Sequence, residues 1–86
     1  MKLKYSLLLS NKFDREFSQL EKAVQDRVVE ALRELNENPQ AGKQLKGKLK
    51  NLWSWRLGKY RILYQIQEEK LLIFAISVRH RKHVYE

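Results

Sequence analysis

Hydrophobic and polar positions change their period twice along the chain. Residues 2–9 begin with alternation and end in an apolar run, which is typical of a β-strand. From residue 11 to residue 35, apolar positions recur every three or four residues, as on one face of a helix. From residue 52 onward the period returns to two. The predicted order is strand, helix, helix, strand, strand, strand.

Two helices are predicted before Pro39. The first follows Ser10 or Asn11, either of which can cap it. Its apolar face consists of Phe13, Phe17 and Leu20. The apolar face of the second helix consists of Val24, Val28, Ala31, Leu32 and Leu35. We expect a break near residues 20–23, and the second helix ends before Pro39 because the residue preceding a proline avoids the α conformation.

The second half of the chain is predicted to form a loop and three strands. The loop is residues 40–50, which contain two glycines and four lysines, with Leu45 and Leu49 contacting the core. The strands are Leu52–Leu57, Tyr60–Gln67 and Leu71–Val78. Gly58 and Lys59 form a tight turn, in which glycine supplies the positive φ, and residues 67–70 form the second turn. Residues 79–86 are a basic tail.

Alternation separates the two faces of the predicted sheet. Four aromatic residues lie on one face of this sheet: Trp53, Trp55, Tyr60 and Tyr64. We expect them to pack in the core rather than to form a binding platform. Arg56 and Arg61 lie on the other face. That face is exposed to solvent if both helices cover the aromatic one. We therefore predict one α+β domain, residues 1–86, with two N-terminal helices on one face of a small, mainly antiparallel four-stranded sheet.

Positive charge is concentrated after Pro39. The chain of 86 residues has a net charge of +8, and residues 1–39 contain seven basic and seven acidic residues. Residues 40–86 contain eleven basic and three acidic residues, so they carry the whole excess. This asymmetry favours an electropositive face and a phosphate-bearing partner over a merely soluble basic surface.

Composition excludes several classes of chemistry. Cysteine is absent, which removes disulfides, thiolate zinc sites and cysteine nucleophiles. No glycine-rich nucleotide loop is present, and His80 and His83 are accompanied only by Glu86, which makes a metal site a poor hypothesis. We expect no cofactor. The chain has neither a targeting signal nor an apolar run long enough to span a membrane, so we expect a soluble, cytoplasmic protein with no membrane partner.

The candidate chemistry is cationic. The group consists of Arg56, Arg61, Arg79, Arg81, Lys82, His80, His83 and Tyr85. Arginine binds phosphate with two parallel hydrogen bonds, aromatic rings stack on unpaired bases, and histidine, lysine and tyrosine transfer protons. Such a set suits metal-free RNA cleavage, in which a 2′-hydroxyl attacks the adjacent phosphate. Binding of a nucleic-acid backbone without chemistry fits the same residues equally well.

Two motifs resemble the RelE/ParE superfamily of bacterial and archaeal toxins. They are R-L-G-x-Y-R-I-x-Y at residues 56–64 and V-x-H-R-x-x-V-Y at residues 78–85, with a hydrophobic strand between them. The two helices and the lysine-rich loop also fit, so the resemblance covers essentially the whole chain. It implies a RelE-like fold and a type II toxin that inhibits translation as a ribosome-dependent endoribonuclease (mRNA interferase), a hydrolase that cuts mRNA in the ribosomal A site. It also implies a RelB-like antitoxin, in a heterotetramer with the toxin.

The resemblance also assigns roles to individual residues. Arg61 matches the arginine that stabilises the scissile phosphate, Arg81 the arginine on the leaving-group side, and Tyr85 the tyrosine that stacks on the mRNA base. Well-studied RelE enzymes carry two lysines where this chain has Ser54 and Arg56. Arg56 supplies charge, while the general base is left open among Lys46, Lys48 and His80. RNA binding is expected at Lys43, Lys46, Lys48, Lys50, Lys59, Arg79 and Lys82.

Three alternatives stay open at this point. A ParE-type member would inhibit DNA gyrase and would have no nuclease activity. A catalytically degenerate member would bind only its antitoxin. For Arg61 itself, the alternative role is an ion pair with Glu68 or Glu69.

Overall fold

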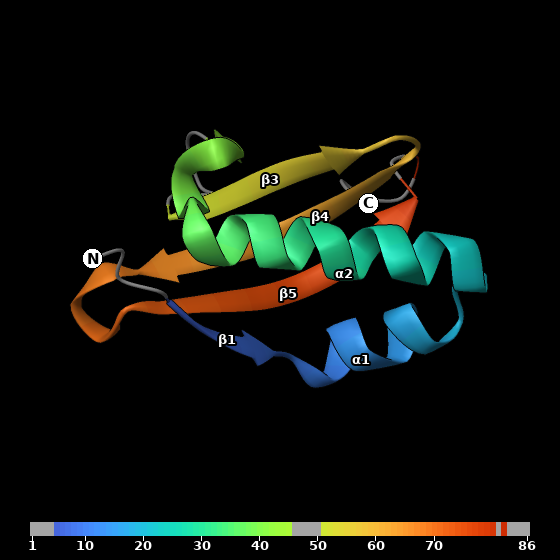
Figure 1. Ribbon diagram of the computed structural model, residues 1–86, viewed down its shortest axis with the longest axis horizontal. Helices are drawn as coiled ribbons and strands as arrows, with labels where there is room; N and C mark the ends of the chain where they lie inside the picture. The colour runs from blue at the N-terminus through green and yellow to red at the C-terminus, as the bar shows by residue number, and fades with distance from the viewer. Residues whose placement is uncertain (1–4, 46–50, 81, 83–86) are drawn as a thin grey trace.

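The structure, a computed structural model, describes residues 5–45, 51–80 and 82. Two helices and a five-stranded sheet make up most of this part of the chain (Figure 1). The elements are β1 (Ser6–Leu9), α1 (Asn11–Ser18), α2 (Lys22–Glu37), η1 (Pro39–Ala41), β2 (Lys43–Gln44), β3 (Leu52–Leu57), β4 (Tyr60–Gln67), η3 (Glu68–Lys70) and β5 (Leu72–His80). None of the helices among these residues is both long enough and apolar enough to cross a membrane.

The strand order in the sheet is β1-β5-β4-β3-β2. β1 pairs with β5 in parallel, and every other pair is antiparallel. Helix α2 runs across the sheet, while α1 lies beside β5 beyond the end of β1 (Figure 1). The α+β prediction, with its helices before the antiparallel strands, is confirmed.

The predicted number of strands was wrong by one. Lys43 and Gln44, which were assigned to a loop, form the short edge strand β2 and pair with Ser54 and Trp53. The backbone N–H of Leu45 also donates to the carbonyl oxygen of Leu52 at 2.8 Å. A strand of two polar residues has too few positions to show a period, so the alternation rule could not identify it.

The core lies between α2 and the covered face of the sheet. Its buried members are Phe13, Val28, Ala31, Leu32, Leu35, Ile62, Tyr64, Ile73, Ala75 and Val78. Phe17, Val24, Trp53 and Trp55 pack against these residues and are partly buried. Burial raises the pKa of Tyr64 to about 12, and its protonated hydroxyl donates to the carbonyl oxygen of Pro39 at 2.7 Å.

A β-bulge in β5 determines which of its side chains face the core. Leu63 pairs with Ser77, while the next residue, Tyr64, pairs with Ala75, so Ile76 is an extra residue on β5. Ser10 stabilises this irregularity, because its hydroxyl donates to the carbonyl oxygen of Ile76 at 2.7 Å. The same oxygen caps α1 by accepting from the N–H of Phe13 at 2.9 Å, as predicted for Ser10.

Both ends of β4 meet β3 or β5 through short turns. Gly58 has φ +60, as predicted for the β3–β4 turn. At the other end, Leu71 adopts a left-handed conformation (φ 49) after η3, so β5 begins at Leu72. β5 continues to His80, two residues beyond the predicted end, which places Arg79 and His80 in the sheet rather than in a tail.

Candidate functional site

Three arginines from three adjacent strands form a row on the sheet face opposite α2. Arg56 of β3 pairs in register with Arg61 of β4, and Arg61 pairs with Arg79 of β5. Residues directly opposite each other project from the same face of a sheet, and neighbouring strands lie about 4.8 Å apart. The three Cα atoms therefore span about 10 Å. We call Arg56, Arg61 and Arg79 the arginine row.

Such a row is unfavourable for folding by itself. Like charges directly opposite each other on neighbouring strands destabilise a sheet. Arg56 is exposed, whereas Arg61 and Arg79 are half-buried, so solvent screens the row only in part. An anion bound across the row would relieve this repulsion, and guanidinium groups suit phosphate because they donate two parallel hydrogen bonds. The arrangement is therefore typical of a phosphate-binding surface.

Ser54 fixes the central arginine. Its hydroxyl accepts a hydrogen bond from Nη1 of Arg61 at 3.3 Å, and the serine is 3% exposed. Glu68 and Glu69, the suggested ion-pair partners of Arg61, lie in η3 at the opposite end of β4. Sequence analysis treated Ser54 only as a missing lysine, although alternation had placed it on the same face as Arg56 and Arg61. The structure gives it a supporting role.

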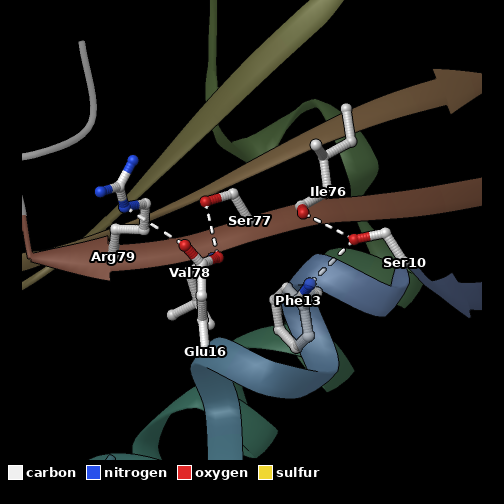
Figure 2. A network of polar contacts seen from close by, with 7 residues as sticks. All are labelled: Ser10, Phe13, Glu16, Ile76, Ser77, Val78 and Arg79. Carbon is white, nitrogen blue, oxygen red and sulfur yellow. Dashed lines mark hydrogen bonds and ion pairs between the residues drawn. The ribbon is translucent and has the colours of Figure 1, made fainter. Parts of the chain in front are cut away.

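Glu16 of α1 fixes the outer arginine (Figure 2). Its Oε1 accepts hydrogen bonds from the hydroxyl of Ser77 at 2.9 Å and from the N–H of Val78 at 3.1 Å. Its Oε2 lies 3.2 Å from Nε of Arg79. The sequence does not single out Glu16, because nothing in a helical pattern indicates a carboxylate that contacts a strand more than sixty residues away.

Two predicted RNA-binding lysines border the arginine row. Lys43 of β2 pairs in register with Ser54, so it lies on the same face, one position along from the row. Lys59 is exposed in the β3–β4 turn, next to the end of β4 that carries Arg61. Lys82 is also exposed. Five predicted site residues lie outside the described residues: Lys46, Lys48, Lys50, Arg81 and Tyr85.

His80 lies on the other face of the sheet from the arginine row. It pairs in register with Tyr60 of the core face, and the two rings meet edge to face with centroids 5.5 Å apart. Its Nδ1 accepts from the backbone N–H of Lys82 at 3.3 Å. The structure therefore brings Arg56, Arg61 and Arg79 together but does not bring His80 to them.

A groove of about 970 Å³ separates α2 from β3 on the helix-covered side of the sheet. Its apolar floor includes Trp55 and Leu57. The α2 wall carries four acidic residues (Asp26, Glu30, Glu34 and Glu37) and two arginines (Arg27 and Arg33), and Arg56 of the arginine row also lines the groove. Its lining therefore has no excess of positive charge, so the arginine row is the better site for RNA.

Comparison with known proteins defines the class. A family model described as "ParE toxin of type II toxin-antitoxin system, parDE" matches residues 3–85. Among curated proteins, toxin RelG of Mycobacterium tuberculosis is 31% identical over 83 residues, covering 94% of this chain and 95% of the relative. The chain belongs to the ParE toxin family, within the RelE/ParE superfamily of toxins from type II toxin–antitoxin systems.

The solved structures to which this chain is similar include RelE toxins. The toxin–antitoxin complex RelBE2 from M. tuberculosis contains a chain that is 31% identical, with a TM-score of 0.85, covering 92% of this chain and all of that one. The isolated RelE toxin of Escherichia coli is 29% identical, with a TM-score of 0.77, covering 94% of this chain and 90% of that one. The chain is thus a RelE-like toxin.

Proposed function

We propose that this toxin is a cytoplasmic, ribosome-dependent endoribonuclease that cleaves mRNA in the ribosomal A site without a metal cofactor. The observation that supports this proposal is the arginine row, in which three arginines lie in register on three neighbouring strands. The lysines at its border extend the positive surface toward a much larger polyanion. The row lies on a sheet surface of a small domain, so its RNA substrate would be presented to it from outside, as a ribosome presents mRNA.

The row suits the charge changes of RNA cleavage. When the 2′-oxygen bonds to the phosphorus and the bond from phosphorus to the 5′-oxygen breaks, the phosphate passes through a state with extra negative charge. Arg61, held by Ser54, lies at the centre of the row and is the residue best placed to stabilise that charge. Arg56 and Arg79 flank it and contact the same phosphate or its neighbours.

Proton transfer needs groups other than the row, because arginine does not lose its proton in proteins. A base must accept the proton of the 2′-hydroxyl, and an acid must protonate the leaving 5′-oxygen. Lys46 and Lys48 are the proposed bases, since His80 lies on the other face. Arg81 stabilises the negative charge on the leaving 5′-oxygen, which takes its proton from the protonated base or from water, and Tyr85 stacks on the mRNA base.

The proposed partner that restrains this activity is a RelB-like antitoxin, bound in a heterotetramer. Similarity to toxins solved in complexes with antitoxins supports this, as in RelBE2 of M. tuberculosis and intact RelBE of E. coli. Coexpression with the neighbouring gene tests it. We expect the product to bind the toxin and to relieve growth arrest, and a neighbour that does neither would remove the proposed partner.

Arg61→Ala tests the nuclease directly. We expect the cleavage rate on mRNA-programmed ribosomes to fall by at least about 100-fold, which is the effect of losing one donor to a transition state. Arg33→Ala is the matched control, because Arg33 is exposed on α2 and pairs only locally with Glu30. Near-wild-type cleavage by Arg61→Ala would reject the role of the arginine row.

Inhibition of DNA gyrase is the second candidate function. It is favoured by the ParE description of the matching family model. Ser54 and Arg56 in place of the lysine pair of RelE enzymes favour instead a degenerate toxin that only binds its antitoxin. A supercoiling assay separates the two functions. Blocked supercoiling with intact mRNA would select the gyrase inhibitor, and loss of both activities with retained antitoxin binding would indicate a degenerate toxin.

A further inference from the structure

The carboxylate of Glu16 is held at three points between α1 and β5 (Figure 2). Oε1 accepts two hydrogen bonds from β5, one from the Ser77 hydroxyl and one from the Val78 N–H. Oε2 is left for Nε of Arg79. The Glu16 side chain is only 19% exposed, so water competes weakly for these contacts. The strand that carries Arg79 therefore also fixes the position of the group that binds it.

This contact determines how the guanidinium group of Arg79 is oriented. Glu16 lies at the Nε side of the group, and Figure 2 shows both terminal nitrogens of Arg79 pointing away from Glu16. These terminal nitrogens form the edge with which arginine donates two parallel hydrogen bonds to a phosphate. The long side chain of Arg79 would otherwise sample many rotamers. Its Nε is held by Glu16, while its two terminal nitrogens point away from this contact.

From its charge alone, Glu16 is expected to weaken RNA binding at the arginine row rather than to support it. A carboxylate beside a phosphate-binding surface repels the ligand, and Glu16 lowers the positive charge of the arginine row. Glu16 forms its ion pair with Arg79, the arginine farthest from the lysine-bearing β2 edge. An acidic residue at this place is favourable for RNA chemistry only if its effect on geometry outweighs its effect on charge.

We propose that Glu16 is a positioning residue of the nuclease, holding Arg79 so that its terminal nitrogens align with those of Arg61 on one RNA phosphate. The inference rests on the proposed endoribonuclease function. Glu16 itself touches no substrate and acts only through Arg79. Its carboxylate slightly weakens the electrostatic attraction of RNA and accelerates the chemical step.

Glu16→Gln separates geometry from folding. The amide oxygen of glutamine can still accept from Ser77 and Val78, whereas its NH₂ group, in place of Oε2, cannot accept from Arg79. We expect the single-turnover cleavage rate at saturating ribosome-bound mRNA to fall about 10- to 100-fold, the scale of a small misplacement of a catalytic group. Affinity for RNA should stay equal or rise, because a negative charge is lost. Glu30→Gln removes the same charge from the exposed Glu30–Arg33 pair and should change neither quantity.

A double-mutant cycle with Arg79→Ala identifies the route of the effect. If Glu16 acts through Arg79, adding Glu16→Gln to Arg79→Ala should change the cleavage rate less than twofold. An equal loss in both backgrounds would show a structural role of α1 and overturn the proposal. Faster cleavage by Glu16→Gln would show that Glu16 only reduces positive charge and would also overturn it.

The experiment also separates failure of this inference from failure of the proposed function. If the wild-type toxin cleaves and Glu16→Gln cleaves at the same rate, only the positioning role is lost. If the wild-type toxin does not cleave ribosome-bound mRNA, the proposed function fails and this inference fails with it.

Discussion

Arg56→Gln should stabilise the fold while weakening the proposed function. Arg56 lies directly opposite Arg61, so their Cβ atoms lie about 5 Å apart, and we take about 6 Å for the separation of the two charges. Two unit charges at that separation in water repel each other by about 0.7 kcal/mol. Arg56 is exposed and Arg61 is half-buried, so salt screens part of this repulsion. We therefore expect the free energy of unfolding to rise by about 0.5 kcal/mol at low salt, within the usual range for cross-strand pairs.

Urea denaturation followed by the fluorescence of Trp53 and Trp55 measures this change. At about 1 M salt the Debye length falls to about 3 Å, and the gain should disappear. Arg33→Gln removes the same charge from an exposed local ion pair and should give no gain at either salt concentration. A loss of stability in Arg56→Gln, or a gain that persists at high salt, would refute the idea that the arginine row is under electrostatic strain.

Two further predictions concern the fold that supports the site. Ser10→Ala removes the α1 cap and leaves the bulge carbonyl of Ile76 without its donor, so unfolding in urea should show a loss of about 1–3 kcal/mol. Ser6→Ala, on exposed β1, should cost less than about 0.5 kcal/mol, and equal losses would contradict the role of Ser10. For Tyr64, the unfolded chain ionises the phenol near pH 10, whereas burial raises the pKa to about 12 in the folded protein, so wild-type stability should fall between these values, by up to about 3 kcal/mol. The stability of Tyr64→Phe should not show this decrease between pH 10 and pH 12. The same pH dependence in the variant would contradict its attribution to Tyr64.

Much of the fold was predictable because its rules are local. Period-two alternation in β3 and β4 is unbroken, so the faces of Trp55, Arg56 and Arg61 follow directly from the sequence. Gly58 is at a position where φ is positive, a conformation that glycine adopts at little cost. Ser10 precedes a helical pattern and caps it as the capping rule predicts. In each case neighbours in sequence determine the geometry.

What could not be predicted depends on contacts between distant segments. The pairing of β2 with β3 and the ion pair from Glu16 to Arg79 each join parts of the chain that no local period relates. The sequence indicated that Arg56, Arg61 and Arg79 are basic and nearby, but not that they are in register. Arg79 was assigned to a tail because nothing local distinguishes a basic strand end from a basic coil.

The bulge at Ile76 makes the length of β5 as important as its composition. Side chains alternate along a strand, so if the bulge closed and Ile76 took a place in the ladder opposite Leu63, every position after it would reverse. Val78 would then face solvent, and Arg79 would point into the core beneath α2. Deletion of Ile76 alone would keep Ser77 opposite Leu63 and Val78 in the core. A single insertion or deletion between Ser77 and Arg79 would reverse Arg79 and should be absent from functional members of this lineage, whereas the η3 turn can vary in length. For anyone aligning or engineering these toxins, a gap placed one residue off after the bulge exchanges the arginine-bearing face for the hydrophobic one.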